Sequence, residues 1–459
     1  MVVLHNHYSP NKMKFTQLTF LLGSLVSGAI LASSSQTPLT ADDYVPLHPH
    51  LEARSRELLA RYPLIDTHID LPATMRTINR RPMDAIPRLN ISHPGHFDIP
   101  RAKKGGLAGA FFTANAPCPG AYGRDVGPDF LGLTETVQHV LESIDLVKNT
   151  LAYYPSLLTA ARTADDVRKA FSDGKLAILM GLEGTHGLSN SLSTLRMYAE
   201  LGVRYVTLTH VCHSSFASSN GGGAGTTGST IPPVHPGNGL TPWGVTLVKE
   251  LNRLGVMVDL SHTSDQTARD AIRHSVAPVV WTHSGARAVH NHPRNVPDDI
   301  LELIGDGPDK NNGIVLSVLF STFIDPSNAT VARVVDHIEH IASIVGKSHV
   351  GLGSDFNGIS LAVKGMEDVS KWPNLIQELL HRGWNESEIE GVMGGNLLRV
   401  MEEVEKVKEE LKDHSPSAEI YEKRTDLPAH EWGGPNMAYL APDVVDIVVE
   451  QKRRFRDEL

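Results

Sequence analysis

Eight short apolar runs, separated by stretches with helical spacing, constrain the fold of this chain more than any other feature. Most of the runs are continuous and rich in β-branched residues, which is typical of parallel strands buried on both faces. The runs are Leu64–Asp66, Leu107–Phe112, Leu176–Gly181, Tyr205–Leu208, Val256–Leu260, Val279–Trp281, Ile314–Val318 and Val350–Gly353. Between them, helices are expected at Thr241–Leu254, which opens with a capping Thr-Pro pair, at Ser264–Arg273 and at Ala329–Val345. Eight β-α units in one chain predict an α/β fold, a (β/α)8 TIM barrel.

The composition excludes several other classes of protein. The chain has 459 residues, of which 41% are hydrophobic and 20% charged, as in a folded globular protein. Its 42 basic and 52 acidic residues give a net charge of −10, which argues against nucleic-acid binding. Only two cysteines are present, so a disulfide-dense scaffold and a four-cysteine zinc module are both excluded. Any metal must therefore be held by histidines and carboxylates.

The N-terminal segment has the features of an export signal. Lys12 and Lys14 precede an uncharged apolar run that ends in small residues at positions 32–34. We expect residues 1–34 to be a signal peptide, with an uncleaved membrane anchor as the alternative. The barrel is expected over residues 50–411. A C-terminal extension is expected over 412–459, with a last helix from about Pro442 to Phe455.

Other short signals bear on where the protein resides. Asn90, Asn328 and Asn385 begin sequons and are the glycosylation sites expected of an exported glycoprotein. The final tetrapeptide, Arg456–Leu459, resembles a signal for retention in the endoplasmic reticulum, although we prefer to interpret it as a charged helix end. Because no apolar tail follows, we expect no GPI anchor. Secretion is the prediction, with retention or membrane anchoring as alternatives.

A His, Asp or Glu follows six of the eight predicted strands. In a TIM barrel the carboxyl ends of the strands converge on one mouth, where active sites lie. A single such residue is more commonly a helix cap or a hydrogen-bonded core residue, but the shared position of six predicts a metal site. The residues in question are His68 and Asp70, Glu183, His210, His262, His283 and Asp355.

Five of these residues are candidate metal ligands. A single zinc site with an open position uses only three protein ligands, so five are too many for one ion. Two Zn²⁺ ions bridged by Glu183 account for all five, with His68 and Asp70 on one ion and His262 and His283 on the other. Such a pair activates a shared water molecule for hydrolysis.

Asp355 and His210 are then the predicted catalytic residues. Asp355 would accept the proton of the water and pass it to the leaving group. His210 would polarise the substrate carbonyl or stabilise the oxyanion. The predicted reaction class is metal-assisted hydrolysis.

From Tyr62 to Val404 the sequence resembles the membrane (renal-type) dipeptidases, zinc peptidases of the amidohydrolase superfamily. The motifs that carry the resemblance are Asp66–Pro72, Gly181–His186, Tyr205–His210, Val258–His262, Thr282–Ser284, Arg294–Asp299, Glu367–Lys371 and Asn396–Val400. The resemblance implies a (β/α)8 barrel, the same five zinc ligands with Glu183 bridging, and hydrolysis of the peptide bond in dipeptides. It also implies a disulfide between Cys118 and Cys212, and a homodimer as one possible assembly.

The resemblance further implies that His210, Arg294 and Asp355 contact the substrate. The guanidinium of Arg294 has a geometry that matches the C-terminal carboxylate of a dipeptide. A carboxylate clamp at that position would limit substrate length and reject long peptides.

The sequence departs from the family pattern at several positions. Thr67 and Ile69 replace the more usual Gly and Asn, Asn357 replaces a common Asp, and Phe320 stands where animal members carry a Tyr that contacts the substrate carboxylate. The segment Ser214–Gly239 also differs. All five metal positions are kept, so the departures bear on substrate preference rather than on activity.

Two other functions remain open at this point. One is a related amidohydrolase acting on a nonpeptide amide or lactone, against which the presence of Arg294 argues. The other is a non-catalytic binding protein on the same scaffold, against which the complete ligand set argues.

Overall fold

The computed structural model describes residues 46–118, 134–221, 236–317, 320–421 and 441–457. These residues belong to one unit, Thr40–Leu459. The predicted signal peptide at 1–34, residue 318 of the seventh predicted strand and part of the predicted C-terminal extension lie outside the described residues.

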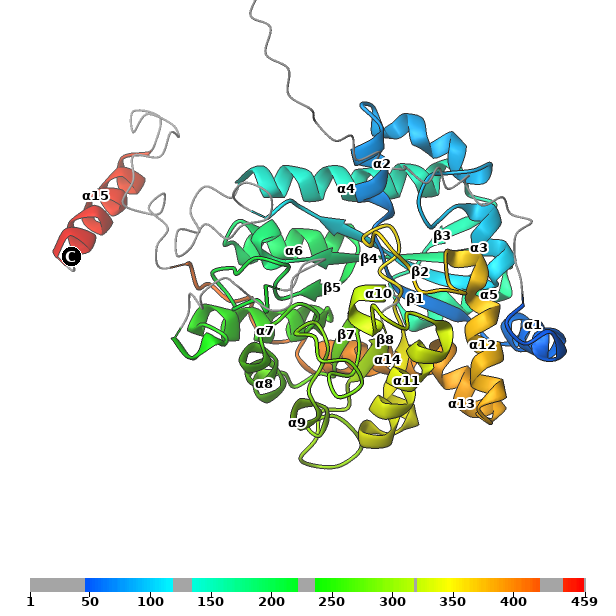
Figure 1. Ribbon diagram of the computed structural model, residues 1–459. Coiled ribbons are helices and arrows are strands. Elements are labelled where there is room, and N and C mark those ends of the chain that lie inside the picture. The colour runs from blue at the N-terminus through cyan, green and yellow to red at the C-terminus, as the bar shows by residue number, and fades with distance from the viewer. Residues whose placement is uncertain (1–45, 119–133, 222–235, 318–319, 422–440, 458–459) are drawn as a thin grey trace, which may run out of the picture. The chain divides into compact units, whose positions relative to one another are not determined.

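The centre of the fold is a sheet of nine parallel strands (Figure 1). Eight of them follow one another in the order β1-β2-β4-β5-β6-β7-β8-β9, and β3 pairs with the start of β4. The strands are β1 Leu64–Ile69, β2 Leu107–Asn115, β3 Leu158–Ala160, β4 Leu176–Glu183, β5 Val203–Thr207, β6 Met257–Asp259, β7 Val279–Ser284, β8 Ile314–Ser317 and β9 Val350–Leu352. All residues of β1, β4 and β7 are buried. This is the burial expected of strands covered on both faces.

The first and last barrel strands meet just past their carboxyl ends. The amide of Asp355 donates to the carbonyl of His68 over 3.0 Å, and the amide of Asp70 donates to the carbonyl of Phe356 over 2.9 Å. Beside them the hydroxyl of Ser354 donates to Asp66 over 2.6 Å. The fold is therefore a (β/α)8 TIM barrel, as predicted, and its closure brings the residues after β1 against those after β9.

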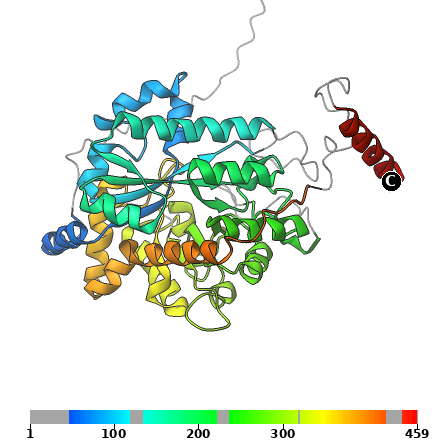
Figure 2. The same ribbon diagram turned by 180° about the vertical axis from the view of Figure 1, so that it is seen from behind.

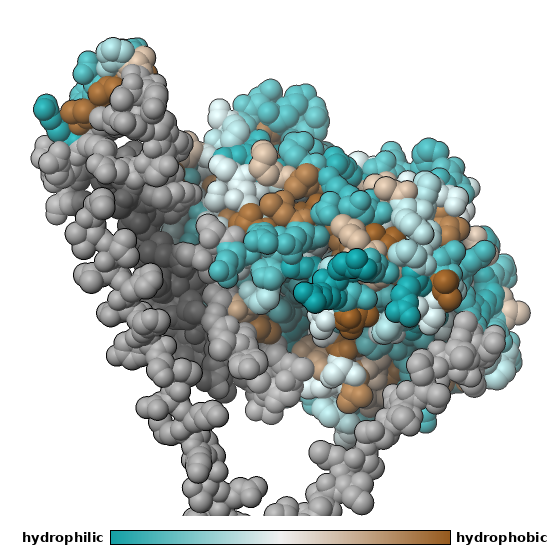
Figure 3. Space-filling model, turned by 90° about the horizontal axis from the view of Figure 1, so that it is seen from above, coloured by the Kyte–Doolittle hydropathy of each residue, from teal (hydrophilic) through white to brown (hydrophobic). Residues whose placement is uncertain are grey.

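Helices pack around the strands (Figures 1 and 2). They are α1 Glu52–Arg61, α2 Leu71–Ile78, α3 Ile99–Gly105, α4 Thr134–Tyr153, α5 Ala164–Ser172, α6 Leu192–Leu201, α7 Pro242–Leu254, α8 Asp265–His274, α9 Asp298–Leu301, α10 Ser321–Ile324, α11 Val331–Val345, α12 Trp372–His381, α13 Glu386–Glu390 and α14 Asn396–Glu410. The last described helix is α15, Pro442–Asp457. Within the parts of the chain that the structure describes, no helix is both long and apolar enough to span a bilayer. On the face seen from above, apolar residues are interspersed with polar ones (Figure 3).

The helix starts follow the capping signals of the sequence. The side chains of Thr241, Ser264 and Thr330 accept hydrogen bonds from backbone amides in the first turns of α7, α8 and α11. A capping side chain of this kind satisfies an amide that has no partner within the helix. These three predicted helices are present, with starts within two residues of the prediction, and the predicted last helix is present as α15, Pro442–Asp457.

All eight predicted strands are present, but β3 was not predicted. β3 has only three residues and lies outside the barrel order, against the start of β4. A run this short shows no usable periodicity, so pairing with β4 is what defines it.

Candidate metal centre

His68 and Asp70 lie where β1 ends and α2 begins. Nε2 of His68 is 3.4 Å from Oδ2 of Asp70. Asp70 occupies the N-cap position of α2 but makes no side-chain cap bond. Its Oδ1 instead accepts a hydrogen bond from Nδ2 of Asn115, at the end of β2, over 3.0 Å. The carboxylate is thus directed by the neighbouring strand rather than by its own helix.

Glu183, the last residue of β4, lies at the centre of the cluster. Its Oε1 is 3.2 Å from Nε2 of His262, 3.4 Å from Nε2 of His283 and 3.6 Å from Nε2 of His68. Its Oε2 is 3.7 Å from Nε2 of His210. One carboxylate therefore faces four imidazoles that come from four different strand ends.

Asp355 completes the cluster from the loop after β9. Its Oδ1 lies 3.9 Å from Nε2 of His68. Gly358 approaches the carboxylates so closely that a Cβ there would lie 2.3 Å from Oδ2 of Asp70 and 2.7 Å from Oδ1 of Asp355. Only glycine fits at this position without displacing both carboxylates.

Two residues of the cluster have left-handed backbones. His262 has φ 66° and Asp355 has φ 64°, in a region that residues with a Cβ occupy at an energetic cost. Asn357 shares this conformation at φ 70°. Asn and Asp are both among the residue types that tolerate it, so the departure from the family Asp keeps a residue suited to this backbone.

Two of the imidazoles are fixed from the side that faces away from Glu183. The hydroxyl of Tyr205 lies 2.9 Å from Nδ1 of His68. Oγ1 of Thr282 lies 2.9 Å from Nδ1 of His283 and itself donates to Oδ2 of Asp259 over 2.7 Å. Such partners fix the ring orientation and leave Nε2 free to bind a metal.

The charges within the cluster are balanced by protons when no metal is bound. Burial opposes the charging of His68, but the carboxylates of Glu183 and Asp70 outweigh it and raise its pKa to about 10. Burial raises the pKa of Asp355 to about 8. Burial likewise lowers the pKa values of His262 and His283 well below the ordinary histidine value. A cation bound here would take over the role of these protons.

The donor set fits divalent metal ions. Nε2 of His68 and Nε2 of His283 are buried and have no hydrogen-bond partner among the described residues. The carboxylates of Asp70, Glu183 and Asp355 are buried beside them. Nitrogen and oxygen donors in this combination suit zinc and similar ions.

The grouping of the donors differs in one respect from the sequence prediction. His68, Asp70 and Glu183 form one group of mutually close donor atoms, as predicted. His262 groups with Glu183 and His210, whereas His283 groups with His68 and Asp355. Nε2 of His283 also lies 3.4 Å from Oε1 of Glu183, so His283 neighbours donors from both predicted pairs.

Arg294 lies beside this cluster, almost fully buried. Its Nη2 donates to the carbonyl of His283 over 3.1 Å, and its guanidinium carbon lies 5.1 Å from the centre of the Phe323 ring. Phe320, also buried, packs edge-on against Phe323. Burial lowers the pKa of Arg294 to about 10, so it remains a cation at neutral pH.

A disulfide joins Cys118 to Cys212 beside His210. Sγ of Cys118 is 3.9 Å from Nδ1 of His210, and Sγ of Cys212 is 3.8 Å from Nδ1 of His186. The rings of His186 and His210 are stacked with centroids 6.4 Å apart. The disulfide and His186 thus form the wall against which His210 packs.

Known proteins resemble this chain over most of its length. The sequence model of the membrane dipeptidases, peptidase family M19, matches residues 52–415. The chain belongs to the membrane dipeptidase family. It is 40% identical over 370 residues to dipeptidase aclJ of Aspergillus oryzae, which covers 78% of this chain and 82% of the relative. It is 36% identical over 380 residues to dipeptidase verJ of Clonostachys rogersoniana, which covers 81% of this chain and 93% of the relative.

A solved structure supports the same conclusion. The metallopeptidase of Rhodobacter sphaeroides, crystallised with a phosphinate mimic of the dipeptide L-Ala-D-Ala, is 26% identical with a TM-score of 0.65. The match covers 75% of this chain and 99% of that protein. This membrane dipeptidase is therefore a metal-dependent dipeptidase, and the alternatives of a nonpeptide amidohydrolase and a non-catalytic protein are set aside.

Sequence reasoning missed the residues that support the dipeptidase site. Tyr205 lies within a strand and is indistinguishable by pattern from a core residue. Asp259 ends a strand, a position where functional residues are expected. Its role as the hydrogen-bond acceptor of Thr282 depends on the direction of its side chain, which the sequence does not give. Asn115 gave no signal. His186 lies in the motif Gly181–His186, but nothing in the sequence indicated that it packs against His210.

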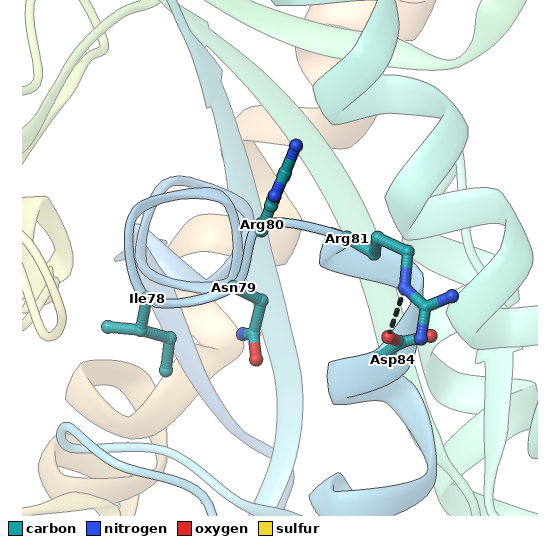
Figure 4. A pocket seen from close by; sticks show the side chains of 5 residues that line it. All are labelled: Ile78, Asn79, Arg80, Arg81 and Asp84. Carbon is teal, nitrogen blue, oxygen red and sulfur yellow. Dashed lines mark hydrogen bonds and ion pairs between the residues drawn. The ribbon is translucent and has the colours of Figure 1, made fainter.

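A surface cavity of about 520 Å³ lies elsewhere on the dipeptidase. It is lined by Ile78, Asn79, Arg80, Arg81 and Asp84, of which Arg81 and Asp84 form an ion pair at 2.8 Å (Figure 4). None of these residues belongs to the metal cluster. Both members of the ion pair are exposed, so the pairing is worth little energetically.

Proposed function

We propose that the dipeptidase acts with two Zn²⁺ ions held by His68, Asp70, Glu183, His262 and His283. The observation that carries the proposal is the central position of Glu183, whose Oε1 lies 3.6 Å from Nε2 of His68, 3.2 Å from Nε2 of His262 and 3.4 Å from Nε2 of His283. A carboxylate placed among the ligands proposed for both ions suits a bridge between them. Bound there, the ions would supply Lewis-acid activation of a water molecule and of the substrate carbonyl.

Asp355 is proposed to move the proton. Its buried carboxyl has a pKa raised to about 8 in the metal-free protein, so it is able to hold a proton near neutral pH. It would take a proton from the attacking water and deliver it to the amine nitrogen that leaves. Its loop conformation, with φ 64°, holds the carboxylate over the cluster.

His210 and Arg294 are proposed to hold the dipeptide at its two critical groups. The side chain of His210 is 26% exposed, against 4% for Glu183, so it is able to reach a substrate carbonyl from the mouth of the barrel. Nη1 of Arg294, which carries two N–H groups, has no hydrogen-bond partner within the described residues. A buried guanidinium with a free Nη1 suits charge-assisted hydrogen bonds to the C-terminal carboxylate.

The zinc proposal is tested by counting metal ions in the full chain. After chelation and addition of Zn²⁺, we expect two ions per wild-type chain and recovery of hydrolysis of L-Ala-L-Ala. His262→Ala and Glu183→Gln should bind fewer ions and lose hydrolysis. His340→Ala, which removes a surface partner of Asp298, is the control and should retain both. Full activity with one ion per chain would contradict the pair.

The substrate range is proposed to include dipeptides with a D-residue at the C-terminus, because the metallopeptidase from R. sphaeroides binds a mimic of L-Ala-D-Ala. A comparison of L-Ala-D-Ala with L-Ala-L-Ala as substrates tests this. Hydrolysis of the L,L dipeptide alone would restrict the proposal to L,L dipeptides.

Export is a separate proposal. We propose that residues 1–34 direct the barrel domain, 50–411, into the secretory pathway and that Asn90, Asn328 and Asn385 are glycosylated there. All three asparagines are exposed, and a disulfide such as Cys118–Cys212 is typical of oxidising compartments. A mass decrease on treatment with an N-glycosidase is the expected result. The C-terminal extension at 412–459, retention by the final tetrapeptide, membrane anchoring and the homodimer remain predictions.

A further inference from the structure

A small cavity of about 20 Å³ touches both His262 and Arg294. Several buried polar atoms on its lining residues have no hydrogen-bond partner among the described residues. They are Nδ1 of His262, Oγ of Ser284, Nε and Nη1 of Arg294, and Oδ1 of Asn295. The four residues are at most 7% exposed. Buried polar atoms without partners are rare in folded proteins, and their gathering on residues that line one cavity points to a bound polar molecule.

His262 differs from the other two candidate histidine ligands in this respect. His68 and His283 each have a hydroxyl 2.9 Å from Nδ1, from Tyr205 and Thr282 respectively. Nδ1 of His262 has no such partner among the described side chains. A histidine that binds metal through Nε2 carries its proton on Nδ1, and that N–H normally donates to an outer partner.

We propose that the cavity binds one structural water molecule that joins His262 to Arg294. This inference rests on the proposed role of His262 as a metal ligand. The volume is sufficient for one water, which needs about 10–15 Å³. The water would accept from Nδ1–H of His262 and Nε–H of Arg294 and would donate to Oγ of Ser284 and Oδ1 of Asn295. Each of these four atoms is thereby paired, and the water makes its full set of four hydrogen bonds.

The water connects the two halves of the proposed chemistry. His262 belongs to the proposed metal centre, and Arg294 is the proposed clamp for the substrate carboxylate. A water that accepts hydrogen bonds from both residues holds the imidazole ring of His262 and the guanidinium of Arg294 in fixed orientations. Ser284, which follows His283 at the end of β7, is then a positioning residue for both, although it contacts neither metal nor substrate.

The direct test is a crystal structure of the metal-free, full-length protein at a resolution that shows internal waters. We expect an ordered water about 3 Å from Nδ1 of His262, Nε of Arg294, Oγ of Ser284 and Oδ1 of Asn295. An empty cavity, or side chains that pair directly with one another, would overturn the proposal. This measurement does not depend on whether His262 binds metal.

Variants of Ser284 give a second test. Ser284→Ala should weaken zinc binding about tenfold in a chelator competition and raise KM for a free dipeptide, whereas Ser284→Thr, which keeps the hydroxyl, should restore both. Ser218→Ala is the matched control, because Oγ of Ser218 is also buried without a partner among the described residues but Ser218 does not line the cavity. Wild-type zinc affinity and KM in Ser284→Ala would contradict the positioning role. Failure of the wild type to bind zinc would instead overturn the proposed function.

Discussion

The hydroxyl of Tyr205 lies 2.9 Å from Nδ1 of His68, whose other ring nitrogen faces Asp70 and Glu183. The same hydroxyl lies 3.1 Å from Oγ1 of Thr113, so it is held on both sides within the barrel. The Tyr205 ring also occupies the space that a side chain at position 181 would need, since a Cβ there would lie 2.0 Å from the ring. Gly181 and Tyr205 together therefore fix the orientation of His68.

Tyr205→Phe removes this hydrogen bond and leaves the ring in place. We expect zinc affinity to fall about 10- to 100-fold, because partners of metal ligands set ligand orientation and basicity. Competition with a chelator of known affinity measures the change. Tyr198→Phe, which removes another buried hydroxyl bonded to the carbonyl of Gly187, is the control and should bind zinc as the wild type does. Equal affinities in the two variants would show that the hydroxyl of Tyr205 plays no part.

Arg294→Ala tests the carboxylate clamp. We expect KM for a free dipeptide to rise about 10- to 100-fold, which corresponds to the loss of hydrogen bonds to a charged group. KM for the same dipeptide as a C-terminal amide should change little, because the amide has no carboxylate to bind. Arg273→Ala, which breaks an ion pair with Asp270 away from Arg294, is the control. An equal rise in KM for the acid and the amide would refute the clamp.

Removal of the Cys118–Cys212 disulfide should affect stability and catalysis together. The bridge spans 94 residues, and the chain-entropy model assigns a loop of this size a stabilisation of about 4–5 kcal/mol. We expect Cys118→Ser/Cys212→Ser to show a lower free energy of unfolding in urea titrations. Its kcat should also fall, because Sγ of Cys118 packs 3.9 Å from Nδ1 of His210. A destabilised variant with wild-type kcat would limit the bridge to a role in stability.

His337 makes stability depend on pH. It is buried, accepts at Nδ1 from the amide of Ala286 and donates from Nε2 to the carbonyl of Ile324, and burial lowers its pKa to about 4. An unfolded chain binds a proton at this histidine below about pH 6.5, whereas the folded protein does so only below about pH 4. Between these values the unfolded state holds the extra proton, so the free energy of unfolding falls as the pH falls.

For His337 alone the decrease is about 1.4 kcal/mol per pH unit, and full stability returns above pH 6.5. Urea titrations at pH 7 and pH 5 measure it. His337→Gln should show a smaller decrease between these values than the wild type, and His414→Gln, which changes an exposed histidine, should not. The same decrease in both variants would assign the pH dependence to other groups.

The barrel could be predicted because its strands are buried on both faces and therefore appear as continuous apolar runs. The positions of His68, Glu183 and Asp355 followed from one rule, that the ends of parallel strands share a mouth. What could not be predicted depends on side-chain direction. Two examples are the position of His283 beside both His68 and Asp355, and the contact of the Tyr205 hydroxyl with Nδ1 of His68. The spacing of residues in the sequence indicates neither contact.

The left-handed backbones of His262 and Asp355 have a consequence for any attempt to make this protein more robust. Each costs roughly 1–2 kcal/mol relative to a glycine at the same position, and each side chain is buried in a cluster of ionisable groups. Replacing either by Gly relieves this cost while it leaves a cavity, so it should destabilise the metal-free protein less than Gly in place of His283, whose backbone is not left-handed. A selection for thermal stability alone would therefore act least against loss of the site at these two positions, so directed evolution of this dipeptidase must select for turnover in every round.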